Sequence, residues 1–138
     1  MKFQPDLLSG VNVVTRQDSG PPPMVWVGTV AFSSSVLVPW VGDVQAWEPG
    51  VPADLRSDDF ERILAFDPEI VIFGSGTSLK FVAPALLRPL IDARIGVETM
   101  DTAAACRTYN VLASEKRKVL AALLIGGPRS RNGSAEVL

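Results

Sequence analysis

Glu69-Ile70-Val71-Ile72-Phe73 is the stretch of the chain that decides the fold, because it is nearly all apolar and rich in β-branched residues. Such a run is typical of a central strand that is covered on both faces. A second strand is predicted at Ile95 to Met100, and a helical segment lies between the two. Strands joined in this way should be parallel, with a right-handed crossover. The sequence therefore predicts an α/β domain built on these two strands.

Helical segments alternate with these strands. Ser57 can cap a helix that carries Asp58, Asp59 and Glu61 in its first turn, where carboxylates complement the helix dipole and need no bound metal to explain them. Pro68 ends this helix before the central strand. The remaining predicted elements are a helix over Pro84 to Ala93 that Pro89 kinks or breaks, a helix from Thr102 to about Ser114, and a last strand from Arg117 to Ile125.

The first fifty residues indicate β-structure of a different kind. Apolar runs at Met24 to Val30 and at Ser35 to Val41 are separated by Pro, Gly, Asp and Ser, which is typical of hairpins or a meander. Pro21-Pro22-Pro23 cannot donate to a strand ladder, so we expect an exposed connection there. The tryptophans, interpreted as core or sheet-packing residues, are Trp26, Trp40 and Trp47.

Length and charge narrow the class of protein. The 138 residues suit one α/β domain, which we place at 1–125, followed by an aperiodic tail at 126–138 that we expect to be disordered. Thirteen basic and fifteen acidic residues give a net charge of -2, which argues against nucleic-acid binding. The absence of histidine excludes Ser-His-Asp triads, Cys-His dyads and most zinc sites. We expect no metal and no cofactor.

Targeting signals are also missing from the sequence. The single cysteine, Cys106, cannot form an internal disulfide, and the start of the chain lacks the pattern of a signal peptide. We therefore expect a cytoplasmic protein. The apolar run from Val119 to Ile125 falls well short of the ~20 residues that cross a bilayer, so no membrane span is expected.

Residues that follow the two parallel strands should meet at one edge of the sheet, where α/β domains usually bind ligands. Glycines let a ligand approach the backbone, and the N-terminus of a helix offers N–H groups to an anion. The third glycine of a dinucleotide fingerprint is missing, and Asp101 is better explained as a helix cap than as a ligand contact. The residues at this edge are Gly74, Ser75, Gly76 and Thr77 after the first strand, and Asp101 and Thr102 after the second.

The predicted helix after Asp101 has one polar and one apolar side. Arg107 and Asn110 lie on the polar side, and Arg107 is either a binding residue, a surface residue or the partner of Asp101 or Glu98 in an ion pair. Cys106 follows a helix start and precedes an arginine, two features that lower the pKa of a thiol. Without a histidine base, we interpret it as a buried small side chain, with a redox thiol as the alternative.

The segment from Gly96 to Leu112 closely resembles a small domain family of largely unknown function, most specifically in its string from Asp101 to Asn110. The family includes a mitochondrial assembly factor for respiratory complex I, an adipogenesis-associated protein, and many bacterial and archaeal members. The resemblance implies a three-layer β/β/α fold with a central mixed sheet and a β-meander at one side, and it implies no established reaction. Supporting matches lie at Gly10-Val11-Asn12, Ser35 to Pro39, Asp67-Pro68-Glu69, Gly74 to Thr77, and Phe81.

Two functions from different classes fit these observations. The first is a non-catalytic binding or assembly module, related to complex I assembly factors, that presents the edge from Asp101 to Asn110 to a protein partner. The alternative is a domain or enzyme that binds an anionic small molecule at the carboxyl ends of the parallel strands, with Arg107 as the counter-charge. The oligomeric state stays open, and a homo-oligomer is one of the alternatives. The candidate site residues are Gly74, Ser75, Gly76, Thr77, Asp101, Thr102, Arg107 and Asn110.

Overall fold

The apolar run at residues 69–73 lies inside a five-stranded sheet. The computed structural model describes residues 10–126 of the chain. The sheet has the order β5-β4-β8-β6-β7, and its strands are β4 Val36–Pro39, β5 Gln45–Ala46, β6 Ile70–Gly74, β7 Gly96–Met100 and β8 Val119–Leu123. β6 runs parallel to β7 and β8, whereas β4 is antiparallel to β5 and β8. The sheet is therefore mixed, and the predicted parallel pair is confirmed.

A three-stranded antiparallel sheet forms from the N-terminal part of the chain. Its strands are β1 Val14–Asp18, β2 Met24–Val27 and β3 Val30–Phe32, in the order β1-β2-β3, which confirms the predicted meander. The apolar run from Met24 to Val30 is divided between β2 and the first residue of β3. The chain turns at Gly28, where φ is 60°, a left-handed conformation that glycine adopts without steric cost.

The helices are short except for the one after β7. They are the 3-10 turn Pro52–Asp54, α2 Ser57–Glu61 with the 3-10 turn Arg62–Phe66, the 3-10 turn Pro84–Leu87 with α3 Arg88–Asp92, and α4 Thr102–Ser114. The break at Pro89 is confirmed, because α3 begins at Arg88 and Pro89 lies in its first turn, where no N–H is required. The prediction that Ser57 caps α2 is wrong. Arg56 is the N-cap, and its N–H donates to the Asp59 carboxylate over 2.8 Å.

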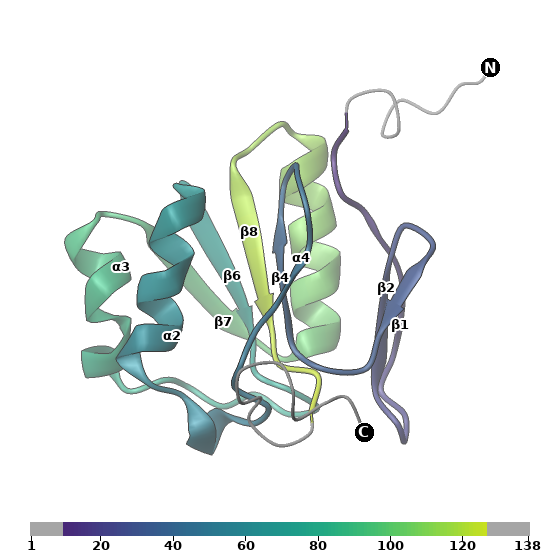
Figure 1. The fold of residues 1–138 in the computed structure, drawn as a ribbon, viewed down its shortest axis with the longest axis horizontal. Coiled ribbons are helices and arrows are strands. Elements are labelled where there is room, and N and C mark those ends of the chain that lie inside the picture. Colours follow the sequence, from purple (N-terminus) through teal and green to yellow (C-terminus); the bar gives the residue numbers. More distant parts are fainter. Residues whose placement is uncertain (1–9, 127–138) are drawn as a thin grey trace.

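The central sheet separates two apolar cores (Figure 1). On one face, α2 and α3 cover a cluster in which the rings of Trp47, Phe60 and Phe73 meet edge to face. On the other face, α4 lies beside the three-stranded sheet, and both contribute to the second cluster, for example through Tyr109 and Val25. The three layers are thus a small sheet accompanied by α4, the mixed sheet, and the short helices, in agreement with the expected β/β/α fold.

The three tryptophans differ in their surroundings. Trp47 is buried, as expected, and Trp40 is half-buried against the α4 core. Trp26 is not a core residue. Its neighbours Val25 and Val27 point into the core, so Trp26 lies on the outer face of the small sheet, with the Arg16 guanidinium 4.4 Å from its ring centroid.

The predicted connection and tail can be placed in part. Pro21 and Pro22 are exposed and lead into β2, as predicted. The tail expected at 126–138 lies outside the described residues apart from Gly126. Within residues 10–126, no helix is both long and apolar enough to cross a membrane.

Candidate functional site

The carboxyl ends of β6 and β7 meet at the start of α4, and this brings the predicted loop and turn together. Gly74 pairs with Met100 at the end of the strands, and the Thr102 N–H donates to the Gly76 carbonyl over 2.9 Å. A Cβ on Gly74 would lie 2.9 Å from Thr102 Oγ1 and 3.1 Å from Ala105 Cβ. Glycine is therefore required at position 74 for the close approach of α4 to the sheet.

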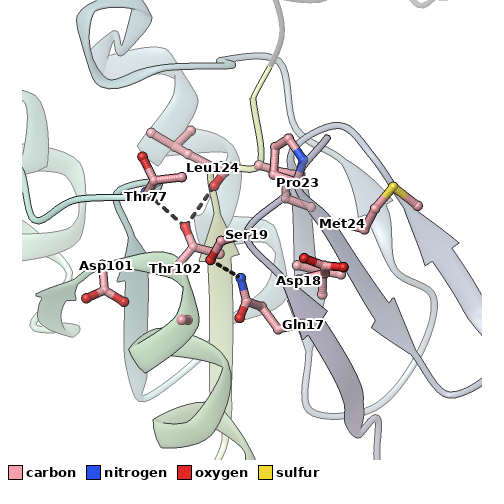
Figure 2. A pocket seen from close by; sticks show the side chains of 13 residues that line it. Gln17, Asp18, Ser19, Pro23, Met24, Thr77, Asp101, Thr102 and Leu124 are labelled. Carbon is pink, nitrogen blue, oxygen red and sulfur yellow. Dashed lines mark hydrogen bonds between the residues drawn. The ribbon is translucent and has the colours of Figure 1, made fainter. Parts of the chain in front are cut away.

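The Thr102 hydroxyl links three segments (Figure 2). It donates to the Leu124 carbonyl over 2.8 Å and accepts the Gly76 N–H over 2.9 Å. Thr102 is itself buried. Its polar atoms are thus engaged within the fold, and they hold the loop after β6, the start of α4 and the end of β8 in one arrangement.

Ser75 shapes the loop in a similar way. Its N–H donates to the Met100 carbonyl over 2.8 Å, its hydroxyl lies 2.8 Å from the Ser78 carbonyl, and the same hydroxyl accepts the Lys80 N–H over 3.0 Å. The residue is buried, with 2% of its surface exposed. A buried hydroxyl with these partners stabilises the loop conformation, and it offers no free nucleophile.

The N-terminus of α4 is occupied by the protein's own carboxylate. Asp101 accepts the Ala104 N–H over 2.8 Å, which confirms the interpretation of this residue as a cap. The carboxylate takes the place where an external anion would complement the helix dipole. This arrangement weakens the case for an anion at the start of α4.

A pocket does lie between the start of α4 and the end of the β1–β2 hairpin (Figure 2). Its volume is about 30 Å³, which leaves room for about two water molecules. Two carboxylates, Asp18 and Asp101, are among its lining residues, together with Thr77 and Ala103. A pocket this small and this acidic suits neither a nucleotide nor another anion.

Further along α4, two side chains fasten the helix to the N-terminal sheet. The Asn110 side chain accepts the Val14 N–H over 2.9 Å and donates to the Val14 carbonyl over 2.8 Å. The Tyr109 hydroxyl lies 3.0 Å from the carbonyls of both Asn12 and Pro39, and burial raises the pKa of this hydroxyl. Asn110 and Tyr109 therefore hold α4 against residues that are far away in the sequence.

The two remaining candidates on α4 differ in accessibility. Arg107 is exposed and takes part in none of the ion pairs found within residues 10–126, so the alternative ion pair with Asp101 or Glu98 is not formed there. Cys106 is buried, and this desolvation raises the pKa of its thiol to about 12 although Arg107 lowers it in part. The interpretation of Cys106 as a buried small residue is confirmed. Arg107 remains as the free charged group on this helix.

A second surface near the same edge includes the predicted Ser75, Gly76 and Thr77, but its residues from Ser78 onward were not among the sequence candidates. It is an open groove of about 280 Å³ whose lining residues include Val51, Thr77, Ser78 and Lys80. Beside Lys80, Phe81 leaves 78% of its surface exposed. The residues from 77 to 83 show no hydrophobic periodicity, so the sequence predicts a loop there and no more. The signal for a binding surface was that this loop is apolar, with Leu79, Phe81 and Val82 in succession around Lys80.

Within 10–126, no group of three or more Cys, Asp or Glu side chains is arranged to hold a metal ion. In the first turn of α2, the Asp59 carboxylate accepts a hydrogen bond from the backbone N–H of Arg56.

Comparison with known proteins places the chain among proteins with the same fold. A family model described as a protein of unknown function (DUF498/DUF598) matches residues 22–124. The NADH dehydrogenase (ubiquinone) 1 alpha subcomplex assembly factor 3 of Mus musculus is 33% identical over 99 residues, which cover 70% of this chain and 52% of that protein. The chain therefore spans about half the length of the curated relatives that it matches first.

Two solved bacterial structures are similar over most of their length. A crystal structure of a Bordetella parapertussis protein has a TM-score of 0.78 and 35% identity, and the match covers 84% of this chain and 97% of that one. A solution structure from Bordetella pertussis, described as a Mth938-like domain, has a TM-score of 0.76 and 29% identity, with 94% and 95% covered. The likeness extends beyond the motif on α4 to the whole fold.

Proposed function

The chain belongs to the family described as a protein of unknown function (DUF498/DUF598), and from this premise we propose that it is a non-catalytic binding module that serves in protein assembly. The observation that carries the proposal is its 33% identity to a protein named as an assembly factor for NADH dehydrogenase. Because the chain spans only about half of that relative, the identity of its own partner belongs to the proposal as well.

The exposed face of α4 is the surface that we assign to the partner. Asp101, Thr102 and Asn110 are engaged in hydrogen bonds within the fold, which leaves Arg107 as the accessible polar candidate. Val111 lies four residues further on the same side of the helix and is 56% exposed. Arginine is enriched at the centres of protein interfaces, and the exposed side chain of Val111 beside it adds apolar surface that a partner would remove from water.

Site-specific photocrosslinking in cells that produce the protein tests this assignment. A photoreactive residue at Val111 should form one dominant protein adduct, and Arg107→Glu in the same chain should reduce its yield. Ile91 on α3 is the matched control position, because it is apolar and 53% exposed on the opposite layer. Equal adducts from both positions, or none from position 111, would rule out the α4 face as the binding surface.

The small-molecule alternative is favoured by one observation, the groove beside Lys80. Among the described residues that line it, Lys80 is the one that carries a charge, and Thr77 and Ser78 add hydroxyl groups. In this form of the alternative, Lys80 replaces Arg107 as the counter-charge of the anion, because Arg107 lies about 7.5 Å along the helix axis from Thr102. Thermal-shift measurements with phosphates, nucleotides and carboxylates test the idea, since a ligand of the folded state raises its stability. A flat response at millimolar concentration, in the wild type and in Lys80→Ala alike, would exclude this alternative.

The cytoplasmic location and the oligomeric state stay predictions. Fractionation of the producing cells would test the first. Sedimentation would test the second.

A further inference from the structure

The outer edge of β7 exposes backbone hydrogen-bonding groups. β7 is the last strand of the five-stranded sheet, and no other strand within residues 10–126 pairs with its outer side. The Gly96 N–H donates to the Glu69 carbonyl over 3.3 Å, and the Met100 carbonyl accepts the Ser75 N–H over 2.8 Å. Both residues therefore direct their backbone groups towards β6. Because these directions alternate along a strand, the N–H and C=O groups of Val97 and Thr99 point outwards.

This edge lacks most of the features that prevent strand pairing. Residues 96–100 keep a continuous register with 70–74 of β6, without a bulge, and they contain no proline. By contrast, β5 at the opposite edge of the sheet is only two residues long. The single charged residue of β7 is Glu98, at its centre, which is exposed and lies in none of the ion pairs of the described residues. Exposed edges usually carry charge, proline or a bulge as protection.

Glu98 disfavours pairing with a second copy of the chain. A symmetric antiparallel pair that uses the outward groups of both Val97 and Thr99 would place Glu98 opposite its own counterpart. Such a position is not hydrogen-bonded across the new interface, and Cα atoms there approach to ~4.5 Å, so two carboxylates would repel strongly. A shifted register that pairs Val97 with its own counterpart would need the Ile95 N–H, which already donates to the Leu90 carbonyl over 3.0 Å.

We propose that the edge of β7 binds an extended segment of a partner protein as an added antiparallel strand, with a lysine or arginine directly opposite Glu98. The outward groups of Val97 and Thr99 would supply the backbone bonds, and the unpaired carboxylate would select a basic residue at the central position. The edge is distinct from the α4 face around Arg107 and Val111. It shares with the proposed function only the assumption of a protein partner.

Nuclear magnetic resonance with a defined probe tests the proposal. The probe is the blocked peptide Thr-Val-Lys-Val-Thr, which reads the same in both directions and so brings its lysine opposite Glu98 in either orientation. Added at millimolar concentration, it should shift the amide signals of Val97 and Thr99 and slow their hydrogen exchange as the bound fraction rises. The matched control peptide with glutamate in place of lysine should bind about fivefold more weakly, given the size of cross-strand charge effects.

Variants of β7 separate the edge from other binding sites. Glu98→Lys should reverse the preference, so that the glutamate peptide binds more tightly than the lysine peptide. Thr99→Pro removes an outward N–H that has no partner within the sheet, and it should abolish binding, whereas Thr99→Val should retain it. The charge reversal keeps the test decisive even if the proline variant does not fold, because Glu98 is exposed.

Three results would overturn the proposal. The first is equal binding of the two peptides in both the wild type and Glu98→Lys. The second is a perturbation that leaves Val97 and Thr99 unchanged. The third is slow exchange of these two amides in the free protein, which would mean that the chain itself or a second copy already covers the edge. None of these results affects crosslinking from Val111, so the two proposals can fail separately.

Discussion

Replacing Asn110 with alanine should weaken the attachment of α4 to the N-terminal sheet and lower the free energy of unfolding by about 2 kcal/mol. Two hydrogen bonds to the backbone of Val14 are lost, each with a net contribution of about 1 kcal/mol. Val14 is buried, so its N–H and C=O would be left with poor access to water, which adds about 1 kcal/mol to the loss. Alanine has the higher helix propensity, and this gain of about 0.6 kcal/mol offsets part of it.

Urea unfolding followed by tryptophan fluorescence measures this difference. Asn110→Leu fills the volume but cannot form the two bonds, so it should be destabilised nearly as much as Asn110→Ala. Arg107→Ala on the exposed side of the same helix is the control and should lie within about 0.5 kcal/mol of the wild type. The reasoning fails if Asn110→Ala is as stable as this control, or if Asn110→Leu restores wild-type stability.

Three further predictions concern the core, the thiol and the pH dependence. Gly74→Ala should lower stability by about 1–3 kcal/mol in the same urea assay, because the new Cβ would lie 2.9 Å from Thr102 Oγ1; Gly96→Ala, whose Cβ would meet Ile70 at 3.8 Å, should cost less. Cys106 should resist iodoacetamide at pH 8 in the folded protein and react in urea, because burial raises its pKa to about 12 and suppresses the thiolate; rapid labelling without urea would contradict this. The Lys118 N–H and the Arg117 guanidinium hold the pKa of Glu69 below its usual value, so its stabilising contribution is present above the unfolded-state pKa and is lost as pH falls through the folded-state pKa. Between pH 7 and pH 3 the melting temperature of the wild type should therefore fall more than that of Glu69→Gln, and parallel curves would refute the prediction.

The elements that could be predicted are those with a strong local signal. β6 could be predicted because four apolar residues follow one another, which is typical of a strand covered on both faces. α4 could be predicted because Asp101 precedes a regular amphipathic pattern. β1 was not predicted as a separate strand. Only Val14 of its five residues is buried, so the segment shows neither alternation nor an apolar run. Strands held at the edge of a small sheet leave little trace in composition.

The candidate site was predictable in position but not in role. The sequence places the loop after β6 and the turn after β7 at one edge, and the bonds between Gly76 and Thr102 confirm this. What no local pattern indicates is the partner of each polar group. Asn110 bonds to Val14, which is 96 residues away, and Thr102 bonds to Leu124. Polar residues on an exposed-looking helix face therefore suggested binding, although the structure uses them to join distant segments.

Because most polar residues of the family motif on α4 bond within the fold, the motif should be interpreted first as structural. Three polar residues of the motif form hydrogen bonds within the fold. Asp101 caps the first turn of α4, and Thr102 bonds to the loop after β6 and to the residue that follows β8. Asn110 bonds to the small sheet. A change at any of them should weaken the helix or its attachment to the fold, so loss of binding in such a variant does not identify a contact. Arg107 and Val111 share the helix but have no such internal role, because both are exposed. Changes at these two positions are therefore the ones that separate a binding defect from a folding defect.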